Sequence, residues 1–138
     1  MTEIAFKTIS APAEAIIKEK RSKFLAFAYP VEKEADIKEI IAILKKKYHD
    51  ASHHCYAYIL GTDKSIFRMN DDGEPSGTAG HPIRGQLLSK GLTNVLVVVV
   101  RYFGGVKLGT GGLRAAYKLS AKEVLENAVI IEKKVTFL

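Results

Sequence analysis

The chain of 138 residues has no tryptophan and a single cysteine. These and other absences bear on disulfide bonds, membrane segments and secretion signals. Cys55 cannot form an internal disulfide, and a lone thiol is more often a small buried apolar group than a nucleophile. No stretch approaches the ~20 apolar residues of a membrane-spanning helix. The first ten residues lack the basic-then-apolar pattern of a secretion signal. We therefore expect a cytoplasmic protein without a membrane segment.

Acidic residues are missing from a long stretch of the second half of the chain. Residues 75–122 contain no Asp or Glu. The cations of this stretch are Arg84, Lys90, Arg101, Lys107, Arg114, Lys118 and Lys122. Because the whole chain has a net charge of +6, its positive excess lies in this one segment. Such asymmetry is typical of a domain that contacts a polyanion such as RNA, provided that the fold brings the cations to one surface.

Length and hydrophobic spacing predict a single α+β domain. Alternating and β-branched segments predict strands over 13–30, 53–60, 65–69 and 94–101. Apolar residues at helical spacing predict helices over 33–50, 82–91 and 109–128. The unbroken apolar run at 95–100 is typical of a strand that is buried on both faces. We expect a two-layer sandwich, with a mixed sheet and its helices on one face.

The acidic motif loop, DDGEPSGTAGHPI at residues 71–83, combines carboxylates with turn-forming residues. Its polar members are Asp71, Asp72, Glu74, Ser76, Thr78 and His81. Turn formation and helix capping by Asp72, Ser76 and Thr78 explain most of the loop. Its carboxylates could instead hold a divalent cation or act as general acid and base. Since the spacing fits no calcium or zinc motif, we expect no metal, no cofactor and no catalytic residue, and we favour a structural and partner-binding role.

The glycine loop, residues 104–112, leads from the predicted buried strand into the last predicted helix. Glycine amides at a helix start can bind a phosphate or carboxylate, although a tight turn capped by Thr110 or a neighbouring backbone group explains the loop equally well. Thr110 stands where a P-loop would have its lysine, which disfavours that nucleotide motif. Tyr102 and Phe103 could stack on bases or pack in the core. The candidate nucleic-acid or anion-binding residues are Arg84, Arg101, Lys107, Gly109, Thr110, Gly111, Gly112, Arg114 and Lys118.

Four stretches of the chain together resemble the YigZ/IMPACT family. They are SKFLAFAYPV, ASHHCYAYIL, DDGEPSGTAGHPI and NVLVVVVRYFGGVKLGTGGLRAAY, and they span most of the chain from Ser22 to Tyr117. The resemblance implies an N-terminal IMPACT domain with an α+β fold like domain two of small-subunit ribosomal protein five. Bacterial members usually continue into a second, ferredoxin-like domain. We therefore expect residues 1–138 to be a single domain of the N-terminal type, with that second domain absent.

The same resemblance implies a role in translation. Eukaryotic members compete for the activator of a kinase that responds to amino-acid starvation, and RNA or ribosome binding is suspected for bacterial members. We therefore expect a non-enzymatic domain that contacts RNA, the ribosome or a translation-regulating protein. The alternative is a phosphate- or nucleotide-binding enzyme. Its glycine loop would hold phosphate, and Asp71, Asp72 or Glu74 would hold magnesium or take a proton.

Overall fold

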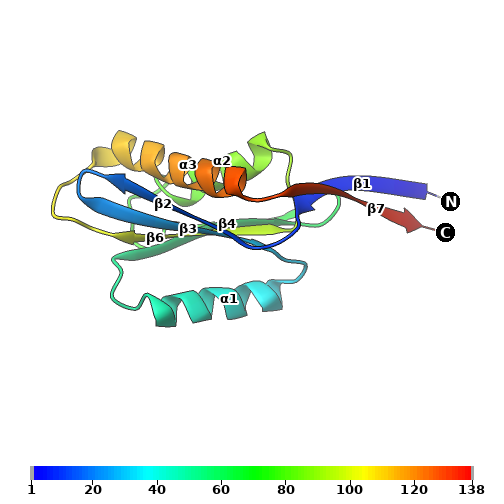
Figure 1. Cartoon of the computed structure of the whole chain (residues 1–138), viewed down its shortest axis with the longest axis horizontal. Helices are drawn as coiled ribbons and strands as arrows, with labels where there is room; N and C mark the ends of the chain where they lie inside the picture. The colour runs from blue at the N-terminus through cyan, green and yellow to red at the C-terminus, as the bar shows by residue number, and fades with distance from the viewer. Residues whose placement is uncertain (1, 138) are drawn as a thin grey trace.

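The computed structural model describes residues 2–137, which form seven strands and three helices (Figure 1). The elements are β1 (Thr2–Ile9), β2 (Ala13–Glu19), β3 (Ser22–Pro30), α1 (Glu34–Lys47), β4 (His53–Leu60), β5 (Ile66–Asn70), α2 (Gly80–Ser89), β6 (Val95–Tyr102), α3 (Gly109–Asn127) and β7 (Ile130–Phe137). The α+β class is confirmed. Each element predicted between residues 13 and 128 is present within a few residues of its expected bounds.

The main sheet has the strand order β2-β3-β6-β4-β5, and every neighbouring pair is antiparallel. The prediction of a mixed sheet was therefore wrong. Strands joined through a helix do run in the same direction, as β3 and β4 do across α1. However, β6 lies between β3 and β4, and β4 lies between β5 and β6. Strands of equal direction are thus never neighbours in this sheet.

Helices cover both faces of the main sheet, so the prediction of helices on one face was also wrong. α1 lies on one side and α2 and α3 lie on the other (Figure 1). The reason is in β6, whose successive side chains point to opposite faces. Leu96, Val98 and Val100 belong to the core under α1, whereas Val95, Val97 and Val99 belong to the core under α2 and α3. An apolar run of this kind needs cover on both sides.

β1 and β7 form a separate two-stranded ribbon that the sequence patterns did not predict. Their antiparallel register runs from Thr2 opposite Phe137 to Ile9 opposite Ile130. The ribbon extends from one end of the main sheet (Figure 1). The β2–β3 turn and the connection from β6 to α3 lie together at the opposite end (Figure 1).

The two-residue turn between β2 and β3, called the hairpin tip below, is formed by Lys20 and Arg21. Both residues have positive φ, 44° and 68°, as a type I′ turn requires. Asn-Gly is usual in such turns, because a left-handed conformation costs other residues about 1–2 kcal/mol each. The tip packs against the glycine loop so closely that a Cβ at Gly104 would lie 2.0 Å from the carbonyl oxygen of Arg21. Gly104 therefore permits the contact that joins the two segments.

Candidate functional site

The acidic motif loop and the glycine loop lie on either side of a cleft of about 460 Å³. Glu74 and Pro75 line it from the first loop, and Lys107, Leu108 and Gly109 line it from the second. These segments are about 30 residues apart in the chain, and the fold brings them together because β4 and β6 are neighbours in the sheet. Of the predicted site residues, Glu74, Arg101, Lys107, Gly109 and Thr110 line this cleft.

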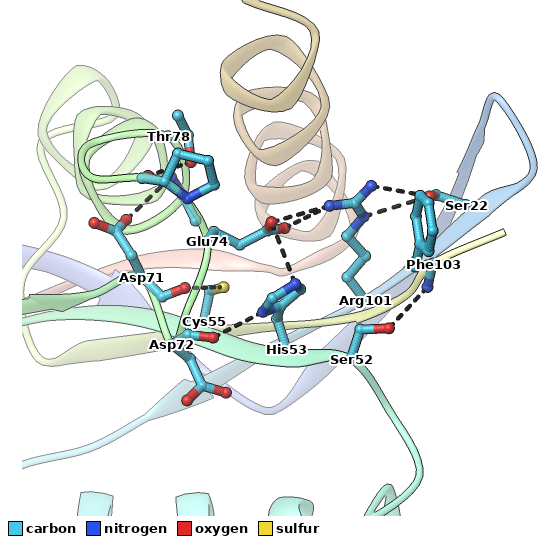
Figure 2. Close-up of polar contacts among 12 residues, drawn as sticks. Ser22, Ser52, His53, Cys55, Asp71, Asp72, Glu74, Thr78, Arg101 and Phe103 are labelled. Carbon is cyan, nitrogen blue, oxygen red and sulfur yellow. Dashed lines mark hydrogen bonds and ion pairs between the residues drawn. The ribbon is translucent and has the colours of Figure 1, made fainter. Parts of the chain in front are cut away.

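The floor of the cleft is a buried ion pair between Glu74 and Arg101 (Figure 2). The two residues are only 7% and 5% exposed. Arg101 Nη1 donates to both carboxylate oxygens of Glu74, at 2.8 and 3.0 Å. Its Nε and Nη2 donate to the hydroxyl of Ser22 at 3.3 and 3.2 Å. Arg101 therefore lies beneath the cleft, and Glu74 balances its charge. It is separate from the exposed cations that were predicted with it.

Tyr117 and Cys55 complete the buried side of this network. The Tyr117 hydroxyl donates to the carboxylate of Glu74. The Cys55 thiol donates to the carbonyl oxygen of Asp71 at 3.1 Å and lies 3.4 Å from the Tyr117 hydroxyl. Burial raises the pKa of both the thiol and the phenol far above their usual values. Cys55 is thus a buried, protonated thiol, which confirms the structural reading of the lone cysteine.

His53 faces the same carboxylate from β4 (Figure 2). Its Nδ1 lies 2.8 Å from the carbonyl oxygen of Asp72, and its Nε2 lies 3.3 Å from Glu74 Oε1. Both neighbours are hydrogen-bond acceptors. The His53 ring therefore lies beside the Glu74–Arg101 pair at the floor of the cleft.

Asp71 has a different role from the one the sequence suggested. Its carboxylate accepts hydrogen bonds from the backbone N–H groups of Gly77, Ala79 and Gly80, at 2.9, 3.1 and 2.8 Å. It therefore caps α2 from nine residues before the helix begins. The expected capping by Asp72, Ser76 and Thr78 was wrong. The cap comes from Asp71 instead, which the turn of the loop brings close to the start of α2.

The other polar groups of the acidic motif loop serve the loop itself or face solvent. The carboxylate of Asp72 accepts from the backbone N–H of His54 at 2.6 Å. The Thr78 hydroxyl donates to the carbonyl oxygen of Pro75. Ser76 and His81 are exposed. Every carboxylate of this loop thus accepts hydrogen bonds from the chain.

Lys107 in the glycine loop and Arg114 and Lys118 on α3 are exposed cations, and we call the three together the basic face. Arg114 and Lys118 are four residues apart, so they project from the same side of the helix, and Lys122 follows at the same spacing. Arg84 lies elsewhere, on α2, with its guanidinium 3.9 Å above the ring of Phe67. Of the five predicted cations, Arg114 and Lys118 thus share one side of α3, Lys107 is exposed in the glycine loop, and Arg84 and Arg101 lie elsewhere.

The glycines and Thr110 lie at the start of α3. Gly109 and Thr110 line the cleft, Gly111 is exposed, and Gly112 lines a neighbouring groove. Of the two predicted caps, the Thr110 side chain is excluded, because α3 follows Leu108 with no side-chain cap. The first backbone N–H groups of this 19-residue helix are therefore not capped by a side chain.

Two structural features bear on the other predicted roles. Within residues 2–137, no three His, Cys, Asp or Glu side chains are grouped in a way that could hold a metal ion. None of the helices in the same range is long and apolar enough to cross a membrane.

Sequence reasoning missed three members of the site, namely Ser22, His53 and Tyr117. Their positions in strands and a helix gave no local signal, since their partners are distant in the chain.

Comparison with known proteins gives consistent results. The family described as "Impact N-terminal domain" matches residues 20–125. The chain is 40% identical over 130 residues to the IMPACT family member YvyE of Bacillus subtilis, covering 94% of this chain and 60% of that protein. Its fold matches the crystal structure of a hypothetical protein with a TM-score of 0.90 and 33% identity, covering 94% of this chain and 64% of the other.

A second solved structure is that of the two-domain translational regulator Yih1. It matches with a TM-score of 0.51 and 27% identity, covering 88% of this chain and 47% of Yih1. The chain thus spans about half to two thirds of the length of the proteins it resembles.

Proposed function

The chain belongs to the IMPACT family, and on that premise we propose that it is a non-enzymatic, translation-associated domain that binds RNA through its basic face. The regulatory role described for Yih1 supports the link to translation. The ribosome, as an RNA-rich particle, is the natural place for such contacts. A translation-regulating protein with an acidic surface is the other partner that this face would suit.

The basic face is the observation that carries the proposal. Lys107, Arg114 and Lys118 are exposed, and no Asp or Glu interrupts the chain from Pro75 to Lys122. Long cationic side chains on one side of a helix can reach successive phosphates of an RNA backbone. Binding of this kind displaces counterions and therefore weakens as salt increases.

The enzymatic alternative has less support. It needs carboxylates that are free to hold magnesium or to move a proton. Asp71 accepts from three backbone N–H groups, and Glu74 is paired with Arg101 and Tyr117. These carboxylates would have to break their present hydrogen bonds before they could serve in catalysis. The arrangement is better suited to holding the cleft in shape.

A salt series tests the proposal. We would measure the affinity of the protein for a single-stranded RNA of mixed sequence, and compare it with the variant in which Lys107, Arg114 and Lys118 are all Gln. Each cation that contacts a single strand contributes ~0.7 to the slope of log affinity against log salt concentration. We therefore expect the variant to bind more weakly, and the magnitude of its slope to be smaller by about 2 than that of the wild type.

The lysines at the end of α1 provide the matched control. Lys45, Lys46 and Lys47 are exposed on the face of the sheet opposite α3, and changing all three to Gln alters net charge by the same amount. This control should bind almost as the wild type does. Equal loss in both variants would mean that net charge alone attracts RNA, and salt-independent binding would contradict the proposed contact.

A further inference from the structure

We propose that the cleft beside the basic face is a site for one nucleotide unit. Its base would lie against Phe103, and its phosphate would lie between Lys107 and the hairpin tip. The inference rests on the proposed function insofar as RNA supplies the nucleotide, but a free nucleotide has the same chemistry. The test below separates these two sources.

Phe103 provides a flat apolar surface at the mouth of the cleft. Its side chain is 48% exposed, although large aromatic side chains are usually well buried. The backbone holds the residue in place, because the Phe103 N–H donates to the hydroxyl of Ser52 at 3.1 Å (Figure 2). The guanidinium of Arg101 lies 5.5 Å from the ring centre. An exposed ring on an anchored backbone is suited to base stacking.

The remaining walls of the cleft suit a ring that inserts beside Phe103. Pro75, Leu108 and Leu113 line it with apolar groups. Its volume of about 460 Å³ falls in the range of small-molecule sites, ~300–1,000 Å³. Polar and charged groups at its floor and rim could orient a ligand, which is also typical of such sites. The walls therefore favour a flat, largely apolar body.

The charges around the cleft favour an anionic end on that body. At the floor, the single carboxylate of Glu74 faces the guanidinium of Arg101 and the imidazole of His53. Lys107 adds a cation that lines the cleft and is itself exposed. Because Glu74 balances Arg101, Lys107 leaves positive charge in excess where the ligand would enter. A flat ring with an anionic group is the chemistry of a nucleotide.

The hairpin tip brings two further cations to this end of the molecule. The backbone of Arg21 lies against Gly104, next to Phe103. Lys20 lines a groove that adjoins the cleft. Leu108 lies between the two and lines both. Glu19 lies in the same groove, so its carboxylate offsets one of the two charges. The tip and Lys107 thus flank the region between cleft and groove where a phosphate would be held.

The test uses a 12-nucleotide single-stranded RNA that carries one 2-aminopurine, together with free adenosine and uridine monophosphates. The first variant is Phe103→Leu, which keeps an apolar side chain and removes the ring. The second variant changes Lys20 and Arg21 to Gln. Phe67→Leu is the matched control, because Phe67 is a similarly exposed ring on β5.

We expect Phe103→Leu to weaken RNA binding about 5- to 150-fold, the range for loss of one base–aromatic stack. The change in 2-aminopurine fluorescence on binding should disappear with it, which loss of charge alone would not cause. The variant of the hairpin tip should weaken binding and keep the fluorescence change. Phe67→Leu should match the wild type in both respects.

The outcomes distinguish this inference from the proposed function. If Phe103→Leu binds RNA normally while the triple variant of the basic face does not, the cleft site is wrong and the RNA-binding face stands. If the wild type binds no RNA but binds a free monophosphate in a manner that needs Phe103, the cleft site stands and the RNA proposal is wrong. If neither probe binds, or neither depends on Phe103, the cleft inference is overturned.

Discussion

The two loops that flank the cleft use charge in opposite ways. The acidic motif loop is rich in carboxylates, yet Asp71 and Glu74 accept hydrogen bonds from the protein itself. The glycine loop contains one charged residue, Lys107, and that residue is exposed. The loop that looks more like an active site in the sequence is therefore the structural one. The loop with little side-chain chemistry is exposed, and it is the one that we propose meets a partner.

This difference follows from where each charge lies relative to the sheet. Glu74 lies over the end of β6, where Arg101 is the last buried residue of the strand and needs a carboxylate to balance its charge. Lys107 lies beyond that strand and is free of the core. Substitutions in the first loop should therefore change stability, whereas substitutions in the second should change binding.

The largest expected effect is that of Arg101→Ala. This change leaves the carboxylate of Glu74 buried without its cation, and removing one partner of such a pair costs about 3–5 kcal/mol. We expect the free energy of unfolding, measured in urea, to fall by that amount. Lys107→Ala, only six residues later, should change it by less than about 0.5 kcal/mol. Similar losses in both variants would remove the contrast between the loops.

Asp71→Ala should have the next largest effect. It removes the acceptor of three backbone N–H groups before α2, and the loss of hydrogen bonds to a charged group costs about 1.5–3 kcal/mol. Asp72→Ala is the matched control, since the Asp72 carboxylate accepts from one backbone N–H and is partly exposed. We expect urea unfolding to show a clearly smaller loss for Asp72→Ala. The reverse order would contradict the capping role of Asp71.

Alkaline pH tests the buried phenol of the same network. Burial, followed by the interactions with Cys55 and Glu74, raises the pKa of Tyr117 above its usual value near 10. Above pH 10 the unfolded chain loses this proton while the folded protein keeps it, so stability should fall as pH rises. The slope from one such group is about 1.4 kcal/mol per pH unit. Because the unfolded phenol is only partly ionised between pH 10 and 11, the unfolding free energy of Tyr117→Phe should fall by about 1 kcal/mol less than that of the wild type over this range. An unchanged slope would place the phenol in contact with solvent.

The smallest expected effect is a gain in stability rather than a loss, from a substitution at the start of α3. A Cβ at Gly111 would meet nothing within 4 Å, and the residue is not among those with positive φ. Gly111→Ala should therefore raise thermal stability by about 0.5–1 kcal/mol, as expected for glycine in a helix. Gly105→Ala is the control, because Gly105 also faces open space but has a φ of 89°. It should destabilise the protein, and a gain there would mean that the loop is not held in this conformation.

Much of the fold could be predicted from the sequence because the patterns are local. The helices and the strands of the main sheet each have a clear hydrophobic period. The apolar run of β6 also implied cover on both faces, although the predicted architecture placed helices on only one. The ribbon of β1 and β7 was not predictable in this way, since its strands pair across the whole length of the chain and are largely exposed.

The site was less predictable, because its contacts join distant residues. Arg101 looked like one more surface cation in a basic segment, and only its place at the end of a buried strand hinted otherwise. Its partners Glu74 and Ser22 are 27 and 79 residues away in the chain. The exposed cations of α3 were predictable, since their spacing alone places them on one side of a helix.

The central claim is that partners meet the glycine loop and α3, while the acidic motif loop holds the structure together. An NMR titration of ¹⁵N-labelled protein with the 12-nucleotide RNA tests it most directly. We expect the largest shift changes in the hairpin tip and in residues 103–118, with small changes in the α1 face and in residues 76–83. Changes centred on α1 or on the acidic motif loop, or no changes at low salt, would contradict the account.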